Sequence, residues 1–223
     1  MKKFLSFSFS LLTLLFFFSC NKVPQFTVIQ VTDNADVTIA IGDEMKVVPI
    51  NSQDEAEFVI EDGALKIYGN SDATLYLPES FLTFITAITV DSNASLESSQ
   101  NLVLDFPKVF ALSVNDNGDL FLNINVPNLY VNISGNGTVE LEGENVNTVT
   151  LNAQDNADYY AFDLFAEDYT LNVTGTAGAV INASNSIIGH IKNSAVVYYL
   201  GNPQNINVIV EDNASFINVT KQQ

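Results

Sequence analysis

The stretch Val114–Leu120, V-N-D-N-G-D-L, decides the fold because close variants of it recur along most of the chain. The shared pattern is an apolar residue, two variable residues, Asn, a tiny residue, one variable residue and a second apolar residue. Further copies begin at Val31, Val90, Ile133, Ala153 and Val210, and two degenerate copies begin at Val173 and Ile191. A short motif repeated in this way predicts a repeat architecture.

The spacing of the copies gives the period of the repeat. The residues at the fourth position, from Asn93 to Asn213, are 24, 19, 20, 20, 18 and 19 residues apart. Apolar residues alternate with polar ones ahead of each copy, and a second short strand pattern follows it. We therefore predict an all-β fold, a right-handed parallel β-helix (a solenoid of about 20-residue coils). An antiparallel β-sandwich of short strands is the alternative.

The region from Phe26 to about Pro78 is expected to form an N-terminal β-hairpin cap. Two strand–turn–strand patterns occur there, one around Gly42-Asp43 and one around Asp62-Gly63. The 59 residues between Asn34 and Asn93 equal about three periods, so early coils of the same repeat are the alternative.

The first residues are typical of an export signal. Lys2 and Lys3 precede an apolar run that ends shortly before Cys20, the only cysteine. The sequence around Cys20 resembles the lipobox of bacterial lipoproteins, in which this cysteine carries the lipid. We expect a signal peptide (residues 1–19), a lipidated tether (20–25) and a single β-helix domain (26–223). An ordinary cleaved signal with an incidental cysteine is the alternative.

The charge excludes one class of partner. The chain has eight Lys, no Arg and 26 acidic residues, a net charge of −18, and without residues 1–19 the net charge is −20. Nucleic-acid binding needs clustered cations that neutralise phosphates, so nucleic acid is not expected as a partner. The expected membrane contact is through the lipid anchor, in the bacterial cell envelope and most simply the outer membrane, on either its periplasmic or its outer side.

Carboxylates are abundant, but they recur with the motif, which favours solvated corner residues over catalytic ones. No catalytic set or zinc motif is present, and no catalysis is expected; a polysaccharide-active β-helix enzyme is a less favoured alternative. No cofactor is expected, apart from a weak possibility of calcium. The weak calcium candidates are Asp116, Asp119, Asp155 and Asp158.

Two other groups of residues are candidates for roles in binding and in structure. Two adjacent tyrosine pairs should each point one ring outward, where it could stack on a sugar or a protein. These candidate binding residues are Tyr159, Tyr160, Tyr198 and Tyr199. Stacked coils should also align the corner amides, because Asn tolerates positive φ and hydrogen-bonds its neighbours. The predicted corner ladder consists of Asn117, Asn136, Asn156 and Asn213.

Four segments carry a resemblance to a known family. They are Val37–Val47, Asp62–Leu65, Ile133–Gly137 (I-S-G-N-G) and Tyr199–Pro203 (Y-L-G-N-P). Together they resemble the head GIN domain family of bacterial cell-envelope proteins, which are candidate heads of autotransporter adhesins. The resemblance implies a right-handed β-helical fold, export and no established catalysis. We therefore expect a lipid-anchored binding or adhesion module that contacts a glycan or an envelope protein, with a structural periplasmic lipoprotein as the alternative.

Overall fold

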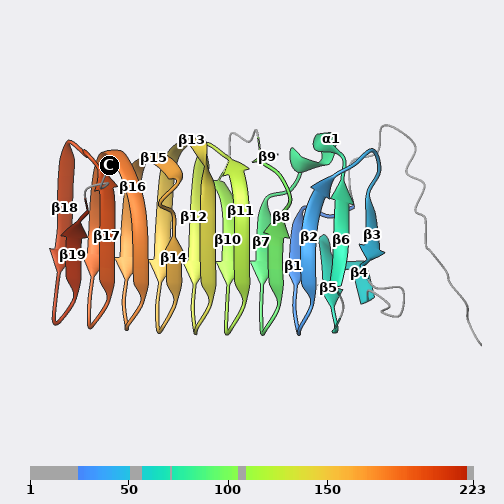
Figure 1. Ribbon diagram of the computed structural model, residues 1–223, viewed down its shortest axis with the longest axis horizontal. Coiled ribbons are helices and arrows are strands. Elements are labelled where there is room, and N and C mark those ends of the chain that lie inside the picture. Colours follow the sequence, from blue (N-terminus) through green and yellow to red (C-terminus); the bar gives the residue numbers. More distant parts are fainter. Residues whose placement is uncertain (1–24, 51–56, 71, 105–108, 220–223) are drawn as a thin grey trace, which may run out of the picture.

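The computed structural model describes residues 25–50, 57–70, 72–104 and 109–219. The chain winds into an elongated β-solenoid, about six turns of which are coils of roughly 20 residues (Figure 1). Nearly all strand pairings are parallel and in register, which confirms the predicted parallel β-helix and excludes the β-sandwich. The predicted signal peptide, and Cys20 with it, lie outside the described residues. No helix in the described part of the chain is long and apolar enough to cross a membrane.

Each coil has one strand before its motif corner and one after it. The strands before the corner form the surface that we call face 1. In order along the solenoid they are β5 (Ala64–Tyr68), β1 (Val28–Val31), β7 (Ala87–Val90), β10 (Val109–Val114), β12 (Asn128–Ile133), the second half of β13 (Thr138–Ala153), β15 (Leu164–Val173), the second half of β16 (Gly178–Ile191) and β18 (Asn205–Val210).

The strands after the corner form the opposite surface, face 2. In the same order they are β6 (Asp72–Leu77), β2 (Asp36–Ile41), β8 (Ser95–Ser98), β11 (Asp119–Asn125), the first half of β13, β14 (Asp158–Tyr160), the first half of β16, β17 (Val196–Gly201) and β19 (Ser215–Asn218). The short strand β9 (Leu102–Val103) pairs with the end of β11.

The core lies between the two faces. In-register pairing stacks residues of the same phase, so Leu112, Val131 and Leu151 form one column whose members are all fully buried. Such columns are the packing reason for the alternation in the sequence, because each coil buries its apolar side only against its neighbours.

The N-terminal end combines the two alternatives left open by the sequence. The coils β1–β2 and β5–β6 belong to the solenoid, but their order is reversed. The later coil β5–β6 lies at the end of the stack, and the earlier coil β1–β2 lies between it and the rest of the solenoid. The strands β3 (Lys46–Pro49) and β4 (Glu57–Glu61) pair antiparallel with β6 and β5, and α1 (Glu79–Leu82) leads on toward β7.

One of the two expected hairpins in this region is present. The β4–β5 hairpin turns at Asp62-Gly63, where both residues have positive φ, as expected. The prediction of a hairpin around Gly42-Asp43 is wrong. The parallel neighbours β6 and β8 occupy both edges of β2, so β3 has no edge of β2 to pair with and pairs with β6.

The motif corner also differs in detail from the expectation. Positive φ occurs at the residue before the motif Asn, as at Asp116 (59°), Gly135 (75°) and Asp155 (64°). Short polar residues and Gly tolerate this left-handed conformation. The Asn itself is therefore not the strained residue, and its side chain is available to bond to the neighbouring coils.

Candidate functional site

The two tyrosine pairs split between the core and the surface. Tyr160 and Tyr198 are exposed on face 2, with 44% and 39% of their surface accessible. Tyr159 is fully buried, so its place among the candidate binding residues is corrected: strand alternation turns it into the core. Tyr199 is half-buried and stacks on Phe216 with ring centroids 4.4 Å apart.

Strand register aligns the exposed rings along the solenoid. The residues at this position of successive coils are Phe121, Glu140, Tyr160, Val180, Tyr198 and Ile217. Aromatic residues therefore occupy every second coil, and we call Phe121, Tyr160 and Tyr198 the aromatic column. The strands that carry successive rings are about 9.6 Å apart, because neighbouring strands are separated by about 4.8 Å.

Sequence reasoning missed Phe121, although a signal for it exists. Each member of the aromatic column stands four residues after the fourth position of its motif, as Phe121 follows Asn117 and Tyr160 follows Asn156. Counting that offset in every copy selects the outward rings and omits Tyr159, which stands at offset three.

Carboxylates surround the middle of the aromatic column. Burial and the nearby Asp158 and Glu140 raise the pKa of Tyr160. Glu140 lies between Phe121 and Tyr160 in register. A surface of rings flanked by negative charge suits neutral or cationic partners and repels anionic ones.

Face 1 has a different character. Tyr130 is 39% exposed there, and its hydroxyl accepts a hydrogen bond of 2.9 Å from Asn152 Nδ2. Asn172 donates in turn to Asn152 Oδ1 at 3.3 Å. The register neighbours of Tyr130 are Ala111 and Thr150, so no aromatic column continues from it.

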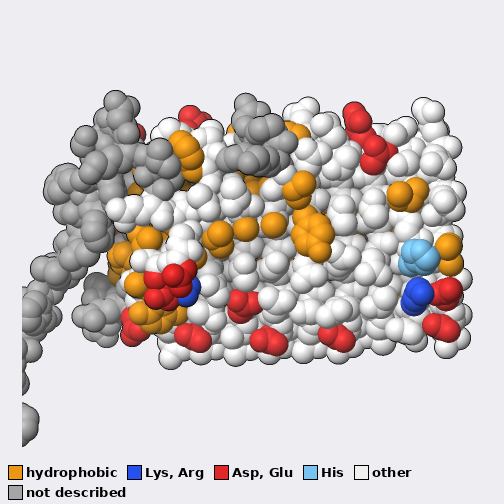
Figure 2. Space-filling view, turned by 180° about the vertical axis from the view of Figure 1, so that it is seen from behind, with side chains coloured by type: hydrophobic (Ala, Val, Ile, Leu, Met, Phe, Trp, Pro, Cys, Tyr) orange, Lys and Arg blue, Asp and Glu red, His pale blue; other side chains and the backbone are white. Residues whose placement is uncertain are grey.

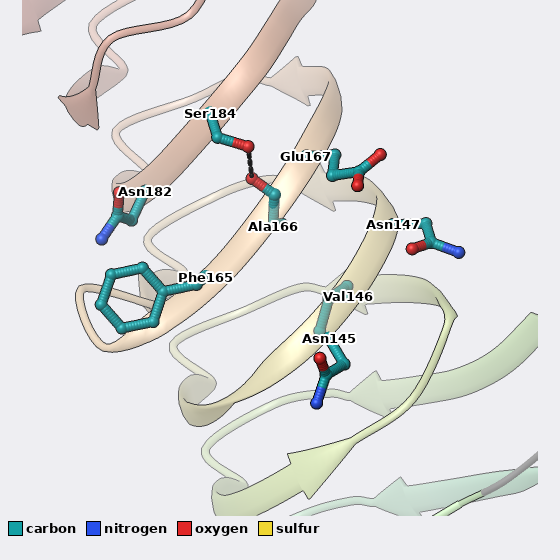
Figure 3. Close-up of a pocket in the computed structure, with 8 residues that line it drawn as sticks. All are labelled: Asn145, Val146, Asn147, Phe165, Ala166, Glu167, Asn182 and Ser184. Atoms are coloured by element: carbon teal, nitrogen blue, oxygen red, sulfur yellow. Dashed lines mark hydrogen bonds between the residues drawn. The ribbon is translucent and has the colours of Figure 1, made fainter.

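A pocket of about 250 Å³ lies beside the aromatic column (Figure 3). It is at the second corner of the coils, where the chain passes from face 2 back to face 1. Phe165 and Asn182 lie on one side of it, and Asn147 and Glu167 lie on the other. Asn182 stands on β16 two residues after Val180, which occupies the register position of the column, and this places the pocket next to the column. The full lining is Asn145, Val146, Asn147, Phe165, Ala166, Glu167, Asn182 and Ser184.

Local hydrogen bonds fix part of the pocket wall. Asn182 is 8% exposed and donates from Nδ2 to the Phe162 carbonyl at 3.1 Å. Ser184 Oγ donates to the Ala166 carbonyl at 3.3 Å. An aromatic ring together with amides and a carboxylate can bind a small polar group such as a sugar hydroxyl. Sequence reasoning did not predict this pocket, because its lining comes from three different coils.

The motif amides form a hydrogen-bonded row along the motif corners, which are the tight corners of the coils. Asn136 Nδ2 donates to Asn117 Oδ1 at 2.8 Å, and Asn156 Nδ2 donates to Asn136 Oδ1 at 3.0 Å. We call this row the amide ladder. In one direction it continues from Asn117 through further asparagines to the N-terminal coils, and in the other direction it ends at a threonine next to Asn156. Its additional members are Asn93, Asn34, Asn70 and Thr176.

Asn213 does not join the amide ladder. The preceding coil carries Ser194 at the same position, and the described bond of Asn213 is a backbone one, from its N–H to the Asn193 carbonyl at 2.8 Å. The structure therefore brings together three of the four predicted ladder residues.

The corner carboxylates are kept apart. Thr138 separates Asp119 from Asp158 in register, and Asp155 Oδ2 accepts a hydrogen bond of 3.3 Å from the Gly135 N–H. Gly135 likewise separates Asp116 from Asp155. Figure 2 shows the carboxylates as separate spots along the tight-corner edge. No group of three or more His, Cys, Asp or Glu residues that could hold a metal ion occurs within the described residues.

Comparison with known families adds to this geometry. The family model described as "Putative auto-transporter adhesin, head GIN domain" matches residues 25–203. The chain belongs to the head GIN domain family. Comparison with curated protein sequences gives no match.

Solved structures share the fold of this head GIN domain. A "putative adhesin" from Bacteroides fragilis superposes with a TM-score of 0.71 at 16% identity, covering 89% of this chain and 94% of that one. Another from Parabacteroides merdae gives a TM-score of 0.60 at 16% identity, covering 90% and 94%. A "putative lipid binding protein" from Parabacteroides distasonis gives 0.59 at 16% identity, covering 90% and 95%.

These relatives are described as adhesins or as a lipid-binding protein, and not as enzymes. An adhesin-like family indicates an envelope or surface-associated protein for this head GIN domain. At this level of identity the solved structures support the fold alone.

Proposed function

We propose that this head GIN domain is an exported, lipid-anchored binding module of the bacterial cell envelope that acts in adhesion. The observation that carries the proposal is the aromatic column, in which three rings are 38%, 44% and 39% exposed at one register position. Aligned rings with a polar surround are typical of recognition surfaces, because they bury much apolar area at little conformational cost.

The ligand classes that fit are a neutral glycan and an envelope protein. Sugar rings offer apolar faces that stack on Tyr and Phe, and the pocket next to the column supplies amides for the hydroxyl groups. The carboxylates Glu140 and Asp158 disfavour an acidic polysaccharide.

A binding screen tests the column. The chain from Asn21 to Gln223, which retains all described strands, is assayed against immobilised neutral glycans and envelope proteins. The variant Tyr160→Ala/Tyr198→Ala should weaken binding of any hit at least about tenfold, equivalent to about 1.4 kcal/mol. Tyr130→Ala removes an equally exposed ring from face 1 and should bind like the wild type. Equal losses in the two variants would show that the column is not the binding surface.

The lipid anchor and the side of display need separate tests. Cys20→Ser should abolish incorporation of labelled fatty acid and release the protein from the membrane fraction. Protease treatment of intact cells then distinguishes surface display, in which the protein is degraded, from the alternative of a structural lipoprotein in the periplasm, in which it is protected.

A further inference from the structure

The last coil exposes residues that belong to the phase of the core. Ile206 and Val210 on β18 are 45% and 43% exposed, whereas their register partners Ile187 and Ile191 on β16 are fully buried. Val208 and Phe216 of the same coil are half-buried. We call the surface formed by Ile206, Val208, Val210 and Phe216 the tip. It is a cross-section of the hydrophobic core rather than a scatter of apolar side chains.

The strand edges at the tip are also open. Within the described part of the chain, β18 pairs with β16 and β19 pairs with β17, each on one side only. The opposite end of the solenoid differs, because β3 and β4 pair antiparallel with its outermost coil. The cap strand β4 carries exposed Glu57 and Glu61, so this end is charged where the tip is apolar, and the tip matches another tip better than it matches the capped end.

Charge favours contact between two tips. The protein carries a net charge of −18, which repels a second copy over most of its surface. The last coil, from Asn205 to Val219, has only Glu211 and Asp212 as charged residues, both at the tight corner. Glu211 is neutralised by Lys192, whose Nζ lies 2.7 Å from Glu211 Oε2. Two tips can therefore approach with little repulsion.

We propose that the tip binds the tip of a second copy of this chain. The contact is isologous, with the same apolar residues on both sides and the free edges of β18 and β19 pairing across the two-fold axis. Burial of the exposed core side chains provides the driving force.

The position of the N-terminal coils gives this contact a consequence. These coils and the tip lie at opposite ends of the solenoid (Figure 1). In a tip-to-tip dimer the two N-terminal ends of the solenoid therefore point away from each other. The next step rests on the proposed lipid anchor at Cys20: the dimer would then join two facing membranes, so that adhesion is homophilic.

The oligomeric state tests the contact itself. Light scattering on the chain from Asn21 to Gln223 should give a dimer that dissociates on dilution. Ile206→Lys/Val210→Lys should be monomeric, with a dissociation constant raised at least about tenfold. Ile188→Lys adds a positive charge at a comparably exposed apolar site on the side of the solenoid and should remain dimeric. Thermal unfolding checks that all three proteins are folded. A monomeric wild type, or a tip variant that still dimerises, overturns the proposal.

Vesicles test the bridging. The chain from Cys20 to Gln223 is coupled through the Cys20 thiol to maleimide-bearing neutral vesicles. The wild type should aggregate them, and the tip variant should not. Dimers in solution without vesicle aggregation would overturn homophilic bridging. Because the aromatic column is not part of the tip, Tyr160→Ala/Tyr198→Ala vesicles should still aggregate, which separates failure of this proposal from failure of the ligand-binding column.

Discussion

Two tyrosines carry their hydroxyl groups into the apolar core. Tyr159 and Tyr169 are both fully buried, and neither hydroxyl makes a hydrogen bond of good geometry within the described residues, although the two hydroxyls interact with each other and that of Tyr169 also interacts with the Asn182 backbone. Burial raises the pKa of both phenols. A buried hydroxyl without a partner costs about 1–3 kcal/mol, so these residues tolerate loss of the oxygen better than loss of the ring.

The phenols predict a loss of stability at alkaline pH. An unfolded Tyr has a pKa of about 10, and the folded values are higher, so the unfolded chain releases these protons first. Their contribution to stability is therefore complete below about pH 10 and decreases as the pH rises above it. Tyr159→Phe/Tyr169→Phe should be at least as stable as the wild type at neutral pH and should lose less stability at alkaline pH. Urea unfolding at both pH values measures this, and parallel losses would contradict it.

Gly189 occupies a strand position that no other residue can take without strain. Its φ is +138°, and a Cβ there would lie 2.0 Å from the Leu171 carbonyl oxygen of the preceding coil. Gly189→Ala should lower the free energy of unfolding by about 3 kcal/mol or more. Gly63→Ala is the control, because Gly63 has φ +77° but a Cβ added there would meet no atom within 4 Å, and should cost only about 1–2 kcal/mol. Equal effects, measured by urea unfolding, would show that the contact with Leu171 is unimportant.

At the scale of the element, the tight corner is built from two neighbouring positions with separate tasks. Asp116, Gly135 and Asp155 adopt positive φ and turn the chain, and the following Asn joins the coils through its side chain. The amide ladder thus adds side-chain hydrogen bonds to the backbone hydrogen bonds that already join successive corners along the solenoid, such as the one from the Asn156 N–H to the Gly135 carbonyl at 2.8 Å.

Removing one rung of the amide ladder should weaken the fold. Asn136→Leu loses the side-chain bonds to Asn117 and Asn156, which at about 0.5–1.5 kcal/mol each should lower the melting temperature by several degrees. Asn132→Leu makes the same change on the flat part of face 1 and should have a smaller effect. An unchanged melting curve for Asn136→Leu would show that the ladder follows from the fold without stabilising it.

At the scale of the whole molecule, acidity dominates the electrostatics. The chain has 26 acidic residues against eight Lys, and its described ion pairs are exposed ones at Lys46, Lys66 and Lys192. Exposed pairs contribute little, so repulsion among the carboxylates is the larger effect and opposes folding.

Screening of this repulsion should raise stability. The melting temperature should increase by a few degrees between low salt and physiological sodium chloride, because the Debye length falls to about 8 Å. Calcium chloride at the same ionic strength should give a similar increase, since Asp116 and Asp155 do not converge. A much larger increase with calcium, confirmed by saturable heat in calorimetry, would establish a calcium site and contradict this interpretation of the corners.

The sequence by itself determined the repeat, the parallel coils, the corner motif and the Asp62-Gly63 hairpin. These features are local, because each coil carries its own alternation and its own corner, and the pattern returns about every 20 residues. The tyrosine-pair pattern leaves open which ring points outward, but Tyr159 stands at the same offset from its motif as Leu120 and Val139, and this local signal agrees with its burial in the structure.

Only the tertiary structure decided which coils are neighbours. The coil β5–β6 lies outside β1–β2, so β2 pairs with strands distant in sequence and the expected hairpin at Gly42-Asp43 does not form. In the later coils, pairing between neighbouring coils aligns Phe121 with Tyr160 and Tyr198 and assembles the pocket around Phe165. It also leaves Ile206 exposed at the tip. Alternation within a strand sets which side of the sheet a residue faces, but its neighbours on that side depend on register between coils, and the burial of the whole core settles that register.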